Sequence, residues 1–502
     1  MLTRLESDSI GTMEVPSKAY YGVQTLRAKK NFNITGRPLH PVFICNLARI
    51  KKAAAITNMN ANLLDERIGK AIMTACDEIV AGKFHTQFIV DAIQGGAGTS
   101  ANMNANEVIA NRAIELLGGS KGDYSIVHPN DHVNMAQSTN DVIPCAGKLT
   151  VMELMPGLIG ELERLDRTLM EKSIEFDDVV KMGRTQLQDA VPIRLGQSFE
   201  AYSAVIKRDI HRMHKIDAEM RVLNIGATAV GTAINVNPIY LFQIIKNINL
   251  VCGTACVQAE DLFDATQNLD GFVHTSGVLK TCAVNLSKIC NDLRLLSSGP
   301  RTGLGEINLP PKQNGSSIMP GKINPVIPEV VSQVAFNVIG NDFTITMAAE
   351  AGQLELNAFE PVLFYKIFES IDTMTGAVRT LIDNCISGIT ANRERCAALV
   401  ESSVSIATAL CPYIGYKKSA EIAKKSLDTG VSVRELVLKE GLMTEEQINE
   451  NLDLYAMTQP GHQAEFKKMR LNQKPAAEPA RTSAKVPGEE SAAALEAIKE
   501  TK

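Results

Sequence analysis

Residues 151–169 read VMELMPGLIGELERLDRTL, a stretch with a regular apolar pattern. Its apolar residues are spaced alternately by four and three positions, which places them along one face of a helix. Pro156 lies inside the pattern, so we expect it either to kink the helix or to mark its start. The stretch therefore predicts a long helix with a buried stripe, as found in helix bundles. The stripe consists of Val151, Met155, Leu158, Leu162, Leu165 and Leu169.

Further segments on the C-terminal side also predict long helices. Two carry apolar stripes, and the segments 325–347 and 361–385 are mostly apolar with helical spacing. Stripes on more than one face indicate that the bundle also packs against other subunits. We therefore expect a mainly α fold built on a central bundle of long helices. The two stripes are Tyr202, Ile206, Ile210, Met213, Ile216, Met220 and Leu223, and Leu279, Cys282, Leu286, Ile289, Leu293 and Leu296.

The composition divides the chain into four parts. Residues 1–140 predict a mixed, mainly helical domain with Gly-rich and Asn-rich loops, and residues 141–387 predict the long-helix bundle domain. Residues 388–471 predict a small helical domain, in which Thr444–Gln447 fit a capping box. Residues 472–502 are rich in Ala, Pro, Glu and Lys, so we expect a disordered tail.

The bulk composition is that of an ordinary globular protein. The 502 residues are 45% hydrophobic and 21% charged, and the formal net charge of -5 gives no reason to expect a nucleic acid or membrane partner. The chain has no uninterrupted apolar run of about 18 residues, so no transmembrane helix is expected. The N-terminus lacks the apolar stretch of a signal peptide, and we expect a cytoplasmic protein.

The ten cysteines are scattered along the chain, and none forms a CxxC pair. We expect reduced thiols that act as small buried hydrophobic groups. Cys252 and Cys256 are four residues apart, but no histidine lies near them in the sequence, so a zinc site is not expected there.

Three polar loops between apolar helices carry residue types that bind anions. The first loop, Gly95–Glu107, reads GGAGTSANMNANE. Glycines let the backbone approach a ligand, and Thr and Asn offer neutral hydrogen-bonding groups. The same residues also fit a tight turn followed by a capped helix, so this loop alone leaves both readings open.

The second loop, His132–Asp141, reads HVNMAQSTND and precedes an apolar helix. Its last four residues fit a helix cap, and they equally fit a site that turns hydroxyls and a positive helix end toward a carboxylate. His128 and His132 have the spacing of a metal-binding pair. Pro129 between them argues against a regular helix, so we expect no metal there.

The third loop, Gly315–Pro325, reads GSSIMPGKINP. It is not a nucleotide-binding P-loop, because its glycine spacing is one residue too long and Ile323 stands where a metal-binding Ser or Thr is needed. Two hydroxyls, a lysine and an asparagine remain, and this set could bind a carboxylate and stabilise extra negative charge on it. The alternative, an ordinary surface loop, is disfavoured by the combination of Pro, Gly and Lys.

The third loop also carries a family resemblance. Gly315–Asn324 match the pattern Gly-Ser-Ser-x-x-Pro-x-Lys-x-Asn at every specified position, and this pattern resembles the signature of the fumarase/aspartase superfamily. The similarity extends over roughly residues 9–454, and it includes the segments 20–25, 183–190 and 226–232 in the expected order.

Within the superfamily the chain is more similar to the aspartase branch than to class II fumarases. Residues 94–100 read QGGAGTS, where fumarases usually have Gln-Thr-Gly-Ser-Gly-Thr. His132 replaces an aspartate common in fumarases, and Ser138–Asn140 read STN in place of their SSN. Gln186 stands where fumarases carry a histidine, although some aspartases also have histidine there.

The resemblance implies a fold, an assembly and a reaction. The fold would comprise three mainly helical domains, and the long helices of four subunits would form a twenty-helix core. Each active site of the homotetramer would combine loops from three subunits. The reaction would be the reversible elimination of ammonia from L-aspartate to give fumarate and ammonium, without an organic cofactor or a metal.

The resemblance also implies residue roles. The β-carboxylate of the substrate would be bound by Thr99, Ser138, Thr139 and Ser317. The α-carboxylate would be bound by Thr185, Lys322 and Asn324, with Gln186 also in the substrate site. Asn140 would contact the amino group, and Ser316 would be the general base.

The chemistry requires stabilised negative charge, because removal of the C3 proton next to a carboxylate creates an aci-carboxylate dianion. A serine base must act as an oxyanion, which backbone N–H groups and Lys322 could stabilise once the segment 311–325 closes and excludes water. Two alternatives remain: a class II fumarase, and a non-catalytic structural homologue of the kind found among lens crystallins.

Overall fold

The structure is a computed structural model, and it describes residues 2–459. It divides into two compact units. The first contains Met1–Met182 and Arg194–Val400, and the second contains Gly183–Ile193 and the chain from Glu401 onward. The domain boundaries predicted after residues 140 and 387 remain predictions, and the predicted tail lies outside the described residues.

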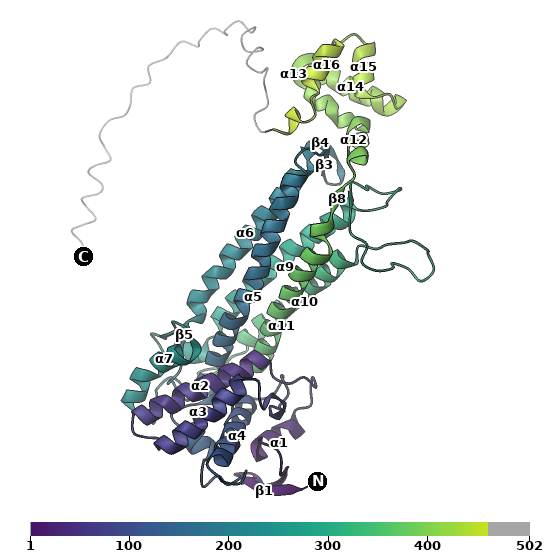
Figure 1. The fold of residues 1–502 in the computed structure, drawn as a ribbon. Coiled ribbons are helices and arrows are strands. Elements are labelled where there is room, and N and C mark those ends of the chain that lie inside the picture. Colours follow the sequence, from purple (N-terminus) through teal and green to yellow (C-terminus); the bar gives the residue numbers. More distant parts are fainter. Residues whose placement is uncertain (1, 460–502) are drawn as a thin grey trace, which may run out of the picture. The chain divides into compact units, whose positions relative to one another are not determined.

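Five long helices form the bundle of the first unit (Figure 1). Each packs against its neighbours in the cyclic order α5, α6, α9, α10, α11 and back to α5. Their buried apolar side chains belong to one continuous core. The prediction of a mainly α fold with a central long-helix bundle is confirmed. The helices are α5 (Thr139–Glu175), α6 (Leu195–Met220), α9 (Asp270–Leu296), α10 (Val326–Glu350) and α11 (Glu360–Asn384).

The stripe that predicted α5 is buried along its whole length, from Val151 to Leu169. The prediction for Pro156 was wrong in one respect, because the helix starts at Thr139 and continues through both Pro144 and Pro156. A proline inside a helix removes one backbone hydrogen bond. Here the apolar face packs over about ten turns of helix, which outweighs that local loss.

One described helix, α5, is long and apolar enough to cross a membrane by length and composition, and a bent pair of helices, 393–402 with 404–414, passes the same test together. In α5 61% of the apolar window is buried within the protein. Such burial is expected of a bundle core helix.

The N-terminal part of this unit packs around one end of the bundle. The helix α2 contacts α3, α4, α5 and α7, and the strands β1 and β2 form an antiparallel hairpin. The elements are β1 (Thr3–Asp8), β2 (Gly11–Pro16), α1 (Val23–Asn31), α2 (Pro41–Asn60), α3 (Glu66–Val80), α4 (Thr99–Leu116) and α7 (Pro238–Cys252).

Short strand pairs join the connections between the bundle helices. The strand β5 (Val222–Leu223) pairs in parallel with β6 (Val257–Gln258), and β7 (Ile307–Asn308) pairs antiparallel with β8 (Thr390–Ala391). The four-residue helix α8 (Asp264–Gln267) precedes α9.

The second unit contains the tip of a hairpin and a group of short helices. The hairpin strands β3 (Val180–Thr185) and β4 (Gln188–Arg194) form a two-stranded sheet, and the chain enters the helical part through α12 (Arg393–Ser402). The Thr444 side chain and Gln447 form the predicted capping box. The helices are α13 (Cys411–Ile414), α14 (Tyr416–Thr429), α15 (Val433–Lys439) and α16 (Glu445–Asn451).

All ten cysteines lie in the described part of the chain, and none forms a disulfide. Cys256 is buried and Cys252 is half-buried. Among residues 2–459, no group of three or more His, Cys, Asp or Glu side chains is arranged to hold a metal ion.

Candidate active site

The second loop ends in the N-terminal cap of α5. Ser138 is the capping residue: its hydroxyl accepts a hydrogen bond from the Asn140 N–H at 3.2 Å, and its own N–H donates to the Asp141 carboxylate at 3.0 Å. This capping box confirms one of the two predicted roles of Ser138–Asp141. It also leaves Thr139 and Asn140 in the first turn of α5, where the helix dipole favours an anion.

Asp141 joins this cap to the segment 226–232. Its carboxylate accepts hydrogen bonds from the N–H groups of Gly226 at 3.1 Å and Thr228 at 3.0 Å. In return the Asn140 amide nitrogen donates to the Ala229 carbonyl at 2.7 Å. Burial raises the pKa of Asp141 to about 6, although the backbone N–H groups oppose that rise. The segment 226–232 therefore fixes the start of α5.

The first loop places Thr99 beside this cap. Gly98 precedes α4 with a φ of 88°, and a Cβ atom there would lie 2.8 Å from the Ile143 side chain of α5. Only glycine allows α4 and α5 to start so close together. The Asn102 amide nitrogen lies 3.3 Å from the Thr139 hydroxyl, which links the two helices. Thr99 is exposed, and Ser138–Asn140 are half-buried, so all four candidate residues lie around one surface.

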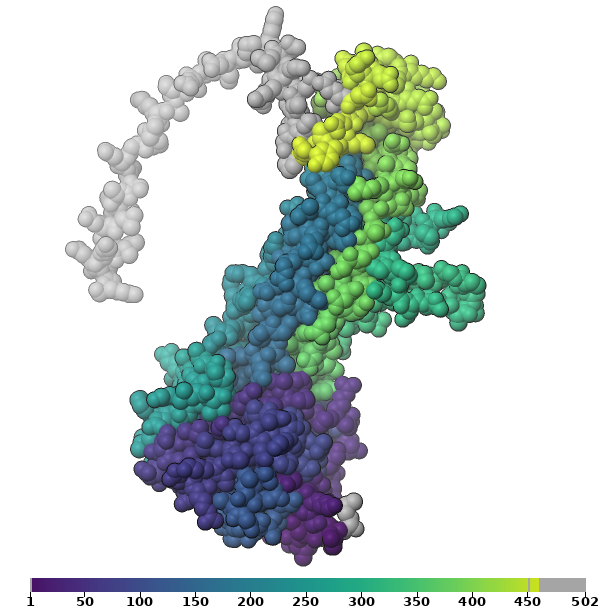
Figure 2. All heavy atoms as spheres, viewed as in Figure 1, coloured from purple at the N-terminus to yellow at the C-terminus, as the bar shows by residue number. Residues whose placement is uncertain are grey.

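The third loop is held closed at its base. The Gly315 N–H donates to the Lys322 carbonyl, and the Asn324 amide donates to the Gly315 carbonyl, both at 2.8 Å. A Cβ atom on Gly315 would lie 2.7 Å from the Lys322 carbonyl oxygen, so glycine is required there. The loop projects outward from the bundle, clear of the N-terminal helices (Figure 2).

The Ser316 hydroxyl is held by backbone N–H groups of the same loop. Its hydroxyl oxygen accepts hydrogen bonds from the N–H groups of Ile318 at 3.2 Å and Met319 at 3.0 Å. Two N–H groups directed at one oxygen stabilise negative charge on it, which is the condition that a serine base needs. The Ser317 and Lys322 side chains are exposed on the same loop.

The remaining candidates lie on the β3–β4 hairpin in the second unit. Thr185 and Gln186 are both exposed. Gln186 and Leu187 form a two-residue turn with φ values of 53° and 63°, the backbone geometry of a type I′ turn. Neither residue is Gly or Asn, which usually occupy such turns.

The two groups of candidates in the first unit lie at opposite ends of the bundle. Ile143 in the second turn of α5 and Pro361 in the first turn of α11 line the same cavity. Because α10 precedes α11 and packs against it, the Ser316 loop lies at the far end of α10, about 37 Å away along 25 helical residues. One chain therefore does not bring Ser316 to Thr139.

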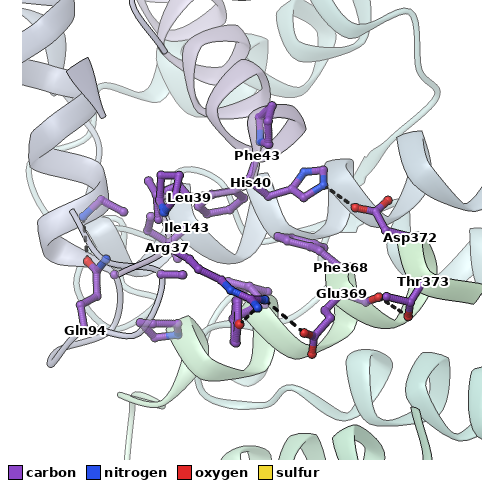
Figure 3. A pocket seen from close by; sticks show the side chains of 18 residues that line it. Arg37, Leu39, His40, Phe43, Gln94, Ile143, Phe368, Glu369, Asp372 and Thr373 are labelled. Atoms are coloured by element: carbon purple, nitrogen blue, oxygen red, sulfur yellow. Dashed lines mark hydrogen bonds and ion pairs between the residues drawn. The ribbon is translucent and has the colours of Figure 1, made fainter. Parts of the chain in front are cut away.

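A cavity of about 400 Å³ is lined by residues of α2, α11 and the first loop, with Ile143 of α5 (Figure 3). Its wall includes Gly98 and Ile143, but none of the predicted site residues lines it. Its basic groups have acidic partners: Arg37 lies 3.5 Å from Glu369, and His40 lies 2.8 Å from Asp372. The cavity is mainly apolar and its basic groups are paired, so its lining does not suit a dicarboxylate.

The histidine pair of the second loop has a structural role. The residues Pro129–Val133 form a π-helical turn, and the His128 N–H donates to Nδ1 of His132 at 2.8 Å. Nδ1 of His128 in turn accepts hydrogen bonds from the Asn130 and Asp131 N–H groups. The expectation that no regular helix spans Pro129 agrees with this geometry.

The segment 20–25, which belongs to the family resemblance, anchors the N-terminal region. The buried Glu107 carboxylate accepts hydrogen bonds from the N–H groups of Gly22 at 2.8 Å and Gln24 at 2.9 Å, and from the Thr25 hydroxyl at 2.5 Å. A Cβ atom on Gly22 would lie 2.5 Å from the Tyr124 hydroxyl. This motif is therefore explained by packing and hydrogen bonding.

Sequence reasoning missed the buried Lys51 and its partner Asn134, whose side-chain atoms lie 2.7 Å apart. A signal was available, because Lys51 follows Leu47 by four residues and precedes Ala54 by three. That spacing places the lysine on the buried face of α2, where a charged group needs a specific reason.

Comparison with known proteins agrees with this architecture. A family model described as "Lyase" matches residues 11–340, and one described as "Fumarase C C-terminus" matches residues 406–459. The chain is 52% identical to an aspartate ammonia-lyase of Bacillus subtilis, covering 91% of this chain and 96% of that protein. It is 48% identical to an aspartate ammonia-lyase of Escherichia coli, covering 92% and 97%.

Solved structures give the same result. A fumarate lyase:delta crystallin from Brucella melitensis is 50% identical, covers 91% of this chain and 100% of that chain, and has a TM-score of 0.89. A class II fumarase from Schistosoma mansoni is 34% identical, covers 92% and 100%, and has a TM-score of 0.88. With the helix bundle, the three polar loops and these relatives all in agreement, the chain belongs to the fumarase/aspartase superfamily of lyases.

Proposed function

We propose that the protein is an aspartate ammonia-lyase, which converts L-aspartate reversibly to fumarate and ammonium by anti-elimination. The observation that carries this proposal is the Ser316 hydroxyl oxygen, which accepts two backbone hydrogen bonds. Relatives at about half sequence identity over nearly the whole chain are aspartate ammonia-lyases, which supports the same activity here.

In the proposed reaction Ser316, as an oxyanion, takes the C3 proton. The electron pair forms the double bond as the carbon–nitrogen bond breaks, and ammonia leaves. Before that step the electrons are held on the β-carboxylate, which becomes a dianion. The hydroxyls of Thr99, Ser138, Thr139 and Ser317, with the positive end of the α5 dipole, are suited to bind it.

Asn140 is suited to contact the amino group at C2. Its amide nitrogen donates to the Ala229 carbonyl at 2.7 Å, so its side-chain oxygen is the atom left to face the substrate. An oxygen acceptor suits the –NH3+ group of aspartate, which carries only donors. Lys322, Asn324 and Thr185 would bind the α-carboxylate, with Gln186 beside them.

The site is proposed to form in a homotetramer, with loops from three subunits. The separation of about 37 Å between the loops at the two ends of α10 supports this assembly, because no single chain can complete the site. The helix α10 also exposes an apolar row at helical spacing. Phe336 is 63% exposed, Ile339 36%, Phe343 69% and Met347 48%, as expected of a face that another subunit covers.

No organic cofactor and no metal is part of this proposal, and L-aspartate, fumarate and ammonium are its small-molecule partners. Neither a nucleic acid nor a membrane partner is proposed, in line with the net charge of -5. A cytoplasmic location belongs to the same proposal.

The test measures fumarate, by its ultraviolet absorbance, from L-aspartate and in parallel from L-malate. We expect fumarate from aspartate, and a loss of about 10²–10⁴-fold in kcat for Ser316→Ala, as for removal of a general base. Ser120→Ala, which changes an exposed loop serine, is the matched control and should keep full activity. Fumarate from malate alone would establish the fumarase alternative, and no product from either substrate would favour the structural homologue.

A further inference from the structure

A fully buried lysine lies behind the candidate active site. Lys51 in α2 has an exposed fraction of 0%, and its ammonium donates to the side-chain oxygen of Asn134 at 2.7 Å. The adjacent Lys52 reaches the surface and pairs with Asp77 at 2.6 Å, as lysines ordinarily do. Burying an ammonium group costs free energy unless hydrogen bonds and nearby charges offset the loss of water. We therefore expect Lys51 to have a specific role.

Asn134 belongs to the second loop and connects Lys51 to other polar residues around that loop. Its side-chain oxygen also accepts hydrogen bonds from the amides of Asn102 at 3.1 Å and Asn106 at 3.2 Å, and its own amide donates to the Gln137 carbonyl at 3.0 Å. Asn134 therefore ties α2 and α4 to the residues that immediately precede Ser138.

Two further hydrogen bonds connect α2 and α4 to the second loop. Asn58, seven residues after Lys51 on the same face of α2, donates to the Met135 carbonyl at 3.1 Å. The Asn102 amide lies 3.3 Å from the Thr139 hydroxyl. A continuous hydrogen-bonded path thus runs from Lys51 through Asn134 and Asn102 to Thr139.

The charged and titratable groups around Lys51 come from two neighbouring helices. Asp141 of α5 faces it as a carboxylate, and Cys76 of α3 faces it as a thiol whose pKa burial raises. Tyr240 of α7 faces Asp141, and burial raises its pKa also, so it stays neutral. Burial lowers the pKa of Lys51 itself to about 7, while Asp141 favours the charged form.

We propose that Lys51 is a positioning residue for the elimination, which acts through Asn134 to hold the Thr139 hydroxyl and the start of α5 against the β-carboxylate of the substrate. The inference rests on the proposed function, and it extends that function to a side chain that does not touch the substrate. Because the β-carboxylate gains charge in the transition state, displacement of Thr139 weakens binding there more than in the ground state.

The experiment compares Lys51→Met, Asn134→Ala and the double variant. We expect each single variant to lower kcat/KM for aspartate at least about tenfold. The kcat/KM of the double variant should equal that of the less active single variant, because the effects of residues on one path are not additive. Succinate has both carboxylates but no amino group, and its inhibition constant should rise in the same three variants.

The matched control is Lys148→Met. Lys148 is a half-buried lysine, and its ammonium donates at 2.7 Å to the Val222 backbone carbonyl of β5 rather than to a side chain of the second loop. It should lower thermal stability but keep kcat/KM within about twofold of the wild type. If Lys51→Met does not assemble, Asn102→Ala serves in its place, because it removes the link to Thr139 and leaves the Lys51–Asn134 contact intact.

The dependence of kcat/KM on pH distinguishes a positioning role of Lys51 from a purely structural role. The wild type should lose kcat/KM as pH rises through the Lys51 pKa, and Lys51→Met should lack that limb. Wild-type activity on aspartate with an unchanged kcat/KM, succinate constant and pH profile in Lys51→Met would overturn the inference. An inactive wild type would instead overturn the proposed function, so the two failures are distinguishable.

Discussion

At the scale of single residues, the buried carboxylate of Asp141 organises the start of α5 at the candidate site. Asp141 caps α5, holds two N–H groups of the segment 226–232, and faces Lys51. The sequence identified Asp141 as part of a cap. The helical spacing of Lys51 indicated that it is buried, but its contact with Asn134 could not be identified, because a hydrogen bond between residues 83 positions apart leaves no local pattern.

Asp141 should make stability depend on pH. Its pKa is raised from 3.8 to about 6, so the folded protein holds this proton more tightly than the unfolded chain does. The resulting stabilisation is fully present below about pH 3.8, and it is lost as pH rises through about 6.

Asp141→Asn removes this titration. The variant also places an amide N–H opposite backbone N–H groups, which should cost about 1–3 kcal/mol. Thermal unfolding of both proteins across the acid range is the measurement. The gap between them should narrow as pH rises, and a constant gap would show that Asp141 does not titrate in this range.

At the scale of elements, most of the fold could be predicted from the sequence. The buried stripes of α5, α6 and α9 follow from local periodicity, since each helix buries one face whatever its neighbours are. The alternative that a helix starts at Pro156 was wrong, because it considered only the local cost of proline. The β3–β4 turn gave no signal, since Gln186 and Leu187 are unusual residues for its geometry.

That turn provides a test of backbone strain. Leu187 has a φ of 63° and is 72% exposed, so replacing it should remove little packing. We expect Leu187→Gly to stabilise the hairpin by up to about 1 kcal/mol, because glycine adopts positive φ without steric cost. Leu187→Ala keeps the strain and is the control. Proteolytic cleavage at the hairpin should slow in the glycine variant only; equal rates would show that the turn is not strained.

At the scale of the whole molecule, the long helices of the bundle set where the chemistry can occur. The loops with Thr139 and Ser316 belong to one compact unit, yet a helix of 25 residues separates them. The order of the loops in the sequence could not reveal this separation, because the direction of each helix is fixed only when the bundle forms. The family resemblance, rather than periodicity, supplied the expectation of a shared site.

A shared site predicts complementation between two inactive variants. Thr139→Val and Ser316→Ala damage different ends of the subunit, so a mixed tetramer contains some sites with both residues intact. After the two proteins are mixed, unfolded and refolded together, activity should recover to about a quarter of the wild-type value, because half of the subunits carry each intact residue. Each variant refolded alone is the control. A mixture as inactive as its components would mean that both residues of a site come from one chain.

The length of α10 also has a consequence for the timing of activity in a cell. Under the proposed function, Ser316 and Thr139 of one chain lie toward opposite ends of α10, a helix about 37 Å long, so a newly made chain would consume no substrate while it is unassembled. Turnover would begin only when copies of the chain meet. At concentrations where the assembly dissociates, the rate per chain falls with dilution, so expression level itself becomes a threshold for activity.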